Sequence, residues 1–187
     1  MKCKRLHLAG VFVAATLAAI AATALAADEH GAASSSGPRT YGLEREVIIG
    51  TQRYRDVAVA EAEGWVNTQN CVSGPDVGAM GVHFANFGLV PDDQFDPQQP
   101  EALIYEMRDG RFRLVGVEFI MLADIWHASG RTDTPVLMGQ LFHYNSAPNR
   151  YGLPPFYALH VWAWRDNPKG TYSNWNPNVS CDQYATP

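Results

Sequence analysis

The chain has 187 residues, of which 47% are hydrophobic and 18% charged, and it contains 16 glycines, 12 prolines and three cysteines. These proportions exclude collagen-like, low-complexity and disulfide-dense proteins and favour one globular domain. The formal net charge is -5. Because a negative surface is repelled by a phosphate backbone, nucleic acid is not an expected partner.

The first 27 residues have the pattern of a secretory signal peptide. Three basic residues (Lys2, Lys4 and Arg5) precede an apolar stretch over residues 8–22 and a small-residue end at residues 24–26, which fits the A-x-A cleavage rule. An uncleaved membrane anchor is the alternative, because the apolar run is almost long enough to span a bilayer. We expect cleavage, export to the periplasm or the extracellular space, and no stable membrane anchor after processing.

The processed chain is expected to be more acidic and to begin with a flexible leader. Residues 1–27 carry three of the 14 basic residues and none of the 19 acidic ones, so the remainder has a net charge of -8. The segment that follows is rich in Ser, Gly and Ala and has no apolar periodicity, which predicts a flexible leader over residues 28–44. Residues 45–187 are then a single globular domain.

Two cysteines remain after processing, because Cys3 leaves with the signal peptide. Cys71 and Cys181 form an even pair in an exported and oxidising compartment, which favours one disulfide that closes a long loop. The alternative is two separate thiols, one of which serves as a nucleophile or a metal ligand.

Hydrophobic periodicity predicts one helix followed by a sheet. Apolar residues recur at spacings of three and four over residues 45–63, and Gly64 is placed to end this helix. Five β-rich runs follow, at residues 80–84, 102–107, 112–121, 136–143 and 156–164. The Asp109-Gly110 pair predicts a hairpin between the second and third runs. The expected fold is α+β, with the N-terminal helix on an antiparallel sheet of about five strands and a coil-rich C-terminus.

Four of these runs contain a titratable residue on the face opposite their large aliphatic side chains. Side chains alternate across a strand, so His83, Glu118, His143 and His160 each share a face with glycine or alanine neighbours. Glu118 is the most informative of the four, because a carboxylate inside the apolar run Leu-Val-Gly-Val-Glu-Phe-Ile-Met is costly to bury without a partner. The small neighbours are expected to leave room for a ligand.

The pattern suggests a divalent-metal site of the His/His/Glu kind. His83, Glu118 and His160 are the expected ligands, with His143 in reserve, and the ion would be Zn, Cu or Fe. Binding should weaken as the pH falls through the histidine range near about 6.5. The alternative is that each histidine is an ordinary hydrogen-bonded core or surface residue. No H-x-H, H-E-x-x-H or C-x-x-C motif occurs.

A second hypothesis rests on the aromatic C-terminal stretch. Trp162, Trp164, Tyr172 and Trp175 could stack on sugar rings or form a protein interface in a non-catalytic binding module. Equally, Trp162 and Trp164, which a continuous strand places on one face, could simply cover the sheet or pack on the helix. A structural envelope protein without a small-molecule site is the third possibility, and the sequence leaves open whether the protein is an enzyme.

Several runs resemble segments of exported bacterial proteins that lack a characterised function. They are Gly81-Val-His-Phe-Ala-Asn86, the segment at residues 96–106, Leu114-Val-Gly-Val-Glu-Phe119, and the segment at residues 159–170. The resemblance covers about residues 45–181. It implies export and one domain, and it assigns no catalytic residue.

Overall fold

The computed structural model describes residues 42–184, except for the side chain of Gln69. The helical segments are α1 (Leu43–Thr51), the 3-10 helix η1 (Gln52–Arg55), α2 (Val57–Ala62) and α3 (Ala123–Ala128). The strands are β1 (Val66–Gly74), β2 (Gly78–Ala85), β3 (Ala102–Arg108), β4 (Arg111–Leu122), β5 (Val136–Leu137), β6 (Gln140–Leu141), β7 (His143–Asn145) and β8 (Phe156–Val161).

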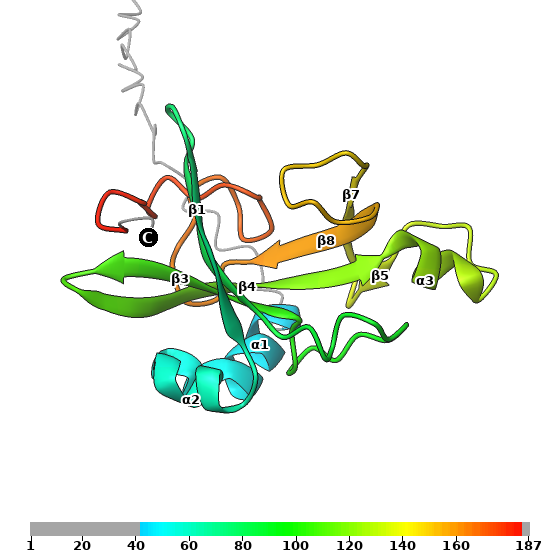
Figure 1. Ribbon diagram of the computed structural model, residues 1–187, viewed down its shortest axis with the longest axis horizontal. Coiled ribbons are helices and arrows are strands. Elements are labelled where there is room, and N and C mark those ends of the chain that lie inside the picture. The colour runs from blue at the N-terminus through cyan, green and yellow to red at the C-terminus, as the bar shows by residue number, and fades with distance from the viewer. Residues whose placement is uncertain (1–41, 185–187) are drawn as a thin grey trace, which may run out of the picture. The chain divides into compact units, whose positions relative to one another are not determined.

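Six strands form one antiparallel sheet in the order β1-β2-β3-β4-β8-β7, and β5 and β6 pair in a separate two-stranded sheet. Figure 1 shows α1 and α2 below this sheet and α3 following the end of β4. The predicted α+β class is confirmed, with six strands in the main sheet where about five were expected. The predicted signal peptide lies outside the described residues. None of the helices within residues 42–184 is long and apolar enough to cross a membrane.

The predicted single helix over residues 45–63 is wrong in two respects. It begins earlier, because Leu43 starts α1 and is buried, so the last part of the predicted leader belongs to the folded domain. It is also interrupted at Asp56, whose backbone is extended and whose carboxylate accepts a hydrogen bond from the Ala58 amide at 3.1 Å. Asp56 thereby caps a new helix, as expected of aspartate at an N-cap.

The predicted strands agree best with the observed strands where the apolar pattern of the sequence is strong. The Asp109-Gly110 hairpin is confirmed, since both residues have positive φ and Arg108 pairs with Arg111. The run at residues 136–143 is not one strand, because Met138 and Gly139 have φ angles of 48° and 87° and turn the chain between β5 and β6. The sequence missed β1, which contains Cys71, and α3, which carries His127.

The two faces of the sheet pack differently. One face covers the main core, in which Val47 of α1 and Tyr54 of η1 lie against side chains such as Phe84 and Leu159. The Tyr105 hydroxyl donates to the Tyr54 carbonyl at 2.6 Å and fixes η1 on β3. The opposite face carries two smaller clusters. One contains Ala79, Ile104, Val115, Trp162 and Val179, and the other contains Ala85, Ala102, Ile120, Phe156 and Ala158.

The predicted disulfide is present. Cys71 of β1 and Cys181 of the C-terminal coil are bonded, with a Cα–Cα distance of 5.7 Å and a sequence separation of 110. The bond ties the coil to the edge of the sheet, and β2 adds a second contact there, because Ala79 and Asn176 form an isolated antiparallel bridge.

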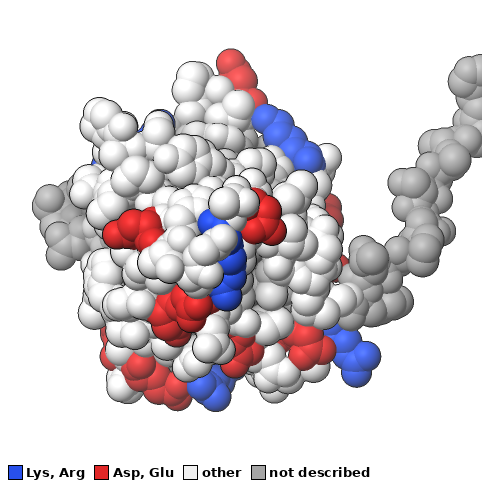
Figure 2. Space-filling model, turned by 90° about the vertical axis from the view of Figure 1, so that its right-hand side faces the viewer, with Lys and Arg blue, Asp and Glu red and all other residues white. Residues whose placement is uncertain are grey.

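Charged groups are dispersed over one face of the molecule. On the face shown in Figure 2, acidic side chains are scattered among uncharged residues, and the basic side chains lie at separate places between them.

Candidate metal centre

Strand register brings Glu118 and His160 together. They are directly opposite each other on the neighbouring strands β4 and β8, so their side chains leave the sheet on the same face at the distance of a cross-strand pair. On its other side Glu118 is opposite Ala102 of β3, which is in turn opposite Ala85 of β2. The two alanine side chains are short and leave the space above β3 open.

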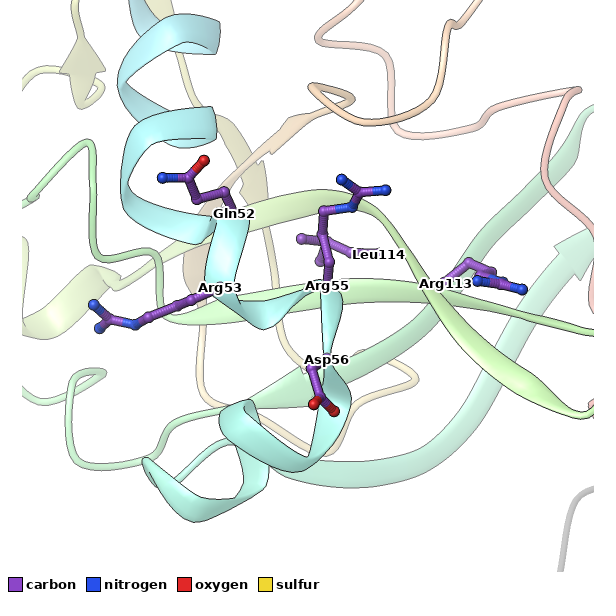
Figure 3. A pocket seen from close by; sticks show the side chains of 6 residues that line it. All are labelled: Gln52, Arg53, Arg55, Asp56, Arg113 and Leu114. Atoms are coloured by element: carbon purple, nitrogen blue, oxygen red, sulfur yellow. The ribbon is translucent and has the colours of Figure 1, made fainter.

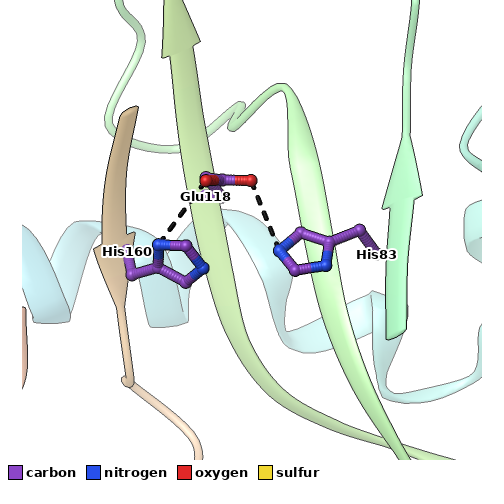
Figure 4. A group of neighbouring side chains, drawn as sticks. All are labelled: His83, Glu118 and His160. Carbon is purple, nitrogen blue, oxygen red and sulfur yellow. Dashed lines mark ion pairs between the residues drawn. The ribbon is translucent and has the colours of Figure 1, made fainter. Parts of the chain in front are cut away.

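His83 reaches the same place from β2. It is opposite Ile104, two residues from the Ala102 position, and its side chain crosses above β3 toward Glu118. Figure 4 shows the carboxylate between the two imidazoles. His83 Nε2 lies 3.3 Å from Glu118 Oε2, and His160 Nδ1 lies 3.5 Å from Glu118 Oε1.

These separations suit a small divalent ion. One ligand atom from each of the three residues lies within 4.8 Å of the others. In a tetrahedral zinc site with bonds of about 2.0–2.2 Å, the ligand atoms are about 3.4 Å apart. The separations of 3.3 Å and 3.5 Å from Glu118 are close to this value, so His83, Glu118 and His160 lie together in an arrangement that could hold a metal ion.

The three groups are buried. The exposed fractions of the His83, Glu118 and His160 side chains are 12%, 11% and 1%. Among the described residues, three buried side-chain atoms have no hydrogen-bond partner, and two of them are the ring nitrogens of His160. Buried polar atoms normally have a partner. His160 thus lacks the hydrogen bonds of an ordinary core histidine, and its polar contact is the Glu118 carboxylate at 3.5 Å.

Burial also determines the charge of the group. It lowers the pKa of His83 to about 4 and raises the pKa of Glu118 to about 8. The pKa of His160 is lowered well below the ordinary value by burial and, to a smaller extent, by His83 and His143. Without a cation, both imidazoles and the carboxyl group are therefore neutral at pH 7.

This result changes the expected pH dependence. The sequence placed it in the ordinary histidine range, on the assumption that the imidazoles must lose protons before they bind. In the folded protein the imidazoles are already neutral there, and Glu118 holds the proton that a metal must displace. The pH dependence should consequently follow Glu118 and lie near pH 8.

His143 does not join the site. It is exposed, on the edge strand β7, and is not one of the three residues whose ligand atoms converge. The sequence placed it beside Gly139 and Leu141 on a continuous strand, and the turn at residues 138–139 removes that strand. Its register partner is Ala158, two residues from His160 on β8.

Two of the small neighbours have a different role from the one expected. A Cβ atom on Gly81 would lie 2.8 Å from both Ile104 Cγ2 and the Tyr105 carbonyl oxygen. A Cβ atom on Gly116 would lie 2.9 Å from the Val161 carbonyl oxygen and 3.2 Å from the Trp162 ring. These glycines allow the neighbouring strands and the Trp162 ring to approach closely. The open space next to Glu118 comes instead from the alanines.

Three of the four aromatic residues of the second hypothesis, Trp162, Trp164 and Tyr172, pack against the hydrophobic clusters. Strand β8 ends at Val161, so Trp162 and Trp164 do not share a face as a continuous strand would require. Trp162 is buried against Ile104 and Val115 and stacks on His160, whereas Trp164 packs into the main core and donates to the Thr51 hydroxyl at 3.1 Å. Tyr172 and Trp175 are both half-buried.

Sequence reasoning missed Glu101 and Tyr151. Glu101 is buried just before β3, accepts a hydrogen bond from the Ile120 amide at 2.9 Å, and has its pKa raised to about 8, chiefly by burial. Its carboxylate thus gives the Ile120 amide of β4 a hydrogen-bond acceptor at a position beyond the end of β3. Tyr151 comes from a loop and lines the cavity above Glu118. Neither residue has a local pattern that reveals its position.

A second hollow lies where η1 meets α2. It has a volume of about 410 Å³ and is lined by Gln52, Arg53, Arg55, Asp56, Arg113 and Leu114 (Figure 3). Three of its charged groups have local partners, because Arg53 bonds Glu63 at 2.8 Å, Arg55 lies over the Trp164 ring, and Asp56 accepts from the Ala58 amide. This hollow contains no histidine or cysteine.

Comparisons of the chain with protein-family models, curated proteins and solved structures find no match.

Proposed function

We propose that the protein is an exported metal-binding protein that holds a divalent transition-metal ion through His83, Glu118 and His160. The observation that carries the proposal is His160, because both of its ring nitrogens are buried without a hydrogen-bond partner, while Nδ1 lies 3.5 Å from a carboxylate oxygen of Glu118 and a second imidazole is close by. A cation at this point would give a nitrogen of His160 a coordination bond where it now has only the 3.5 Å contact with Glu118.

The ligand set limits the metal. Two imidazoles and one carboxylate are a borderline donor set that suits Zn²⁺, Cu²⁺ or Fe²⁺ better than Ca²⁺ or Mg²⁺, which prefer oxygen ligands. Three protein ligands leave at least one coordination position open, as in catalytic zinc sites and in the two-histidine, one-carboxylate sites of non-haem iron enzymes. A bound ion of this charge would supply a Lewis acid to whatever occupies that position.

Glu118 provides a means of controlling the charge. In the metal-free protein it retains its proton, so the buried site carries no net charge at pH 7. Binding of a divalent cation makes the carboxylate the favoured form, and the proton is released to solvent. Glu118 thus keeps the metal-free site neutral, and in the metal-bound site its negative charge offsets part of the positive charge of the ion.

Export is supported by the signal-peptide pattern and by the disulfide. Structural disulfides persist in oxidising compartments, and Cys71–Cys181 closes a long loop of this domain. In such a compartment a site made of histidine and glutamate has the advantage that it contains no oxidisable thiolate ligand.

Zinc titration of protein purified without an affinity tag tests the proposal. We expect one equivalent of Zn²⁺ to bind, measured by competition with a chromogenic chelator and by elemental analysis after dialysis. Glu118→Gln keeps the size of the side chain and removes its charge, and should weaken binding at least tenfold. His143→Ala is the matched control, because His143 lies on the same sheet face outside the group. Equal losses in both variants would contradict the assignment.

A further inference from the structure

A cavity of about 230 Å³ opens directly above the proposed metal centre. Its wall is built from β1, β2, β3, β4, the start of β8 and two loops, and Glu118 and His83 form part of its lining. Most of the remaining wall is apolar. The aliphatic part consists of Val72, Ala85, Val90, Ala102, Ile120 and Leu153.

The cavity exists because side chains are small where the strands face it. Ala85 and Ala102 are opposite each other on β2 and β3, in the same row as Glu118. Any longer aliphatic side chain at these positions would project into the space next to the carboxylate. An apolar cavity of about 150 Å³ is large enough to bind benzene, so a cavity of about 230 Å³ can take a ring with a short substituent.

The entrance is apolar as well. Phe87 and Tyr151 line the cavity and are 58% and 40% exposed, so two aromatic rings are accessible to solvent at its rim. Exposed aromatic side chains at the mouth of an apolar cavity are typical of a ligand site. Thr68 and Asn70 of β1 supply the other polar groups of the lining.

Charge defines the polar end of the ligand. Two neutral imidazoles and one carboxylate leave a single net positive charge when a divalent ion is bound. The cavity lining contains one carboxylate, Glu118, and neither lysine nor arginine. An uncompensated charge in an apolar, largely buried site is unfavourable, and an anionic donor from the ligand would neutralise it.

We propose that this cavity binds a small apolar carboxylate, with its carboxylate on the metal held by His83, Glu118 and His160 and its apolar body between the alanine row and the aromatic rim. This assignment rests on the proposed metal function and adds the class of ligand. Acetate, benzoate and benzamide are suitable probes, because they separate the contributions of charge and apolar size.

Isothermal titration calorimetry of the zinc-loaded, tag-free protein tests the assignment. The ring of benzoate would bury roughly 100 Å² of apolar surface that acetate does not have. At about 25 cal/mol per Å², a carboxylate with this ring should bind on the order of 50-fold more tightly than one without it. Benzoate is therefore expected to exceed acetate by about this factor, and neutral benzamide should bind at least tenfold more weakly than benzoate. Removing the zinc should weaken benzoate binding by at least tenfold.

A pair of matched variants locates the binding. Val90→Trp places an indole in the cavity from a loop, away from the three ligands, and should lower benzoate affinity at least tenfold with zinc affinity unchanged. Val136→Trp is the control, because Val136 is 51% exposed and lies outside the cavity. It should change neither affinity.

The outcomes distinguish the two proposals. If zinc binds through the three residues but benzoate binds no better than acetate, the ligand assignment is overturned and the metal function stands. If benzoate binds equally well with and without zinc, the cavity is an apolar site independent of the metal, which also overturns the assignment. If zinc does not bind at these residues, both proposals fail. The comparison of acetate with benzoate needs no variant, so a misfolded Val90→Trp protein leaves the test intact.

Discussion

Replacing His160 by leucine separates a metal ligand from an ordinary core histidine. Leucine is apolar and close to histidine in volume, and position 160 is buried on β8 between the Trp162 and His83 rings. A hydrogen-bonded core histidine would stabilise the fold, so its loss would be costly. His160 has no hydrogen-bond partner on either ring nitrogen, so the metal-free protein already bears the desolvation cost of these atoms.

The size of the effect follows from that cost. A buried polar group without a partner costs about 1–3 kcal/mol, and its replacement by an apolar group of similar shape is neutral or stabilising. In the presence of a chelator, His160→Leu should therefore leave the free energy of unfolding unchanged or raise it by as much as about 3 kcal/mol. With zinc at 100 times its dissociation constant, the wild-type protein should gain about 2.7 kcal/mol. The variant should gain almost none of this.

Urea denaturation followed by tryptophan fluorescence, with chelator and with zinc, measures both quantities. The informative result is the reversal of order: the variant is at least as stable as the wild type without metal and less stable with it. A loss of 2 kcal/mol or more in chelator would refute the reasoning, because it would show that His160 stabilises the metal-free fold. An equal gain from zinc in both proteins would refute the ligand assignment.

Three further predictions concern pH, the disulfide and a close contact. Zinc affinity should rise about 50-fold from pH 6 to pH 8, because a carboxyl group with a pKa of about 8 loses its proton over that range, and chelator competition should show a flat response in Glu118→Gln. A rise centred near pH 6.5 would instead point to the histidines. Replacing Cys71 and Cys181 by serine should lower the free energy of unfolding by about 4–5 kcal/mol in the chain-entropy description, with zinc stoichiometry retained. Gly116→Ala should cost about 1–3 kcal/mol in denaturation experiments because its methyl group would press on the Trp162 ring and the Val161 carbonyl; an unchanged stability would show that this contact is not tight.

The sequence predicts on which face of its strand each site residue lies, but it does not predict that the three residues come together. Alternation of side chains is a local property, so it correctly puts His83, Glu118 and His160 opposite the large aliphatic residues of their strands. Their convergence depends on β8 pairing with β4 and on β3 lying between β2 and β4. These are contacts between segments far apart in the sequence, and the apolar pattern of each strand is compatible with other orders.

The errors have local causes. β1 was missed because residues such as Asn67, Thr68 and Asn70 interrupt its apolar pattern, and its pairing with β2 has two register irregularities. The helix was predicted as continuous because Asp56 fits the polar face of a longer helix as well as it fits an N-cap. The turn at residues 138–139 is difficult to anticipate, since a positive φ angle is unusual for methionine.

The central claim is that one divalent ion binds between β2, β4 and β8. The most direct measurement is an anomalous-difference map at the zinc absorption edge from a crystal of the zinc-loaded, tag-free protein. If the ion binds there, the map should show one strong peak about 2.0–2.2 Å from an imidazole nitrogen of His83, a carboxylate oxygen of Glu118 and a nitrogen of His160. The claim would be contradicted if fully occupied zinc peaks lay at surface groups such as His143 or His127 and no peak lay between the three buried side chains.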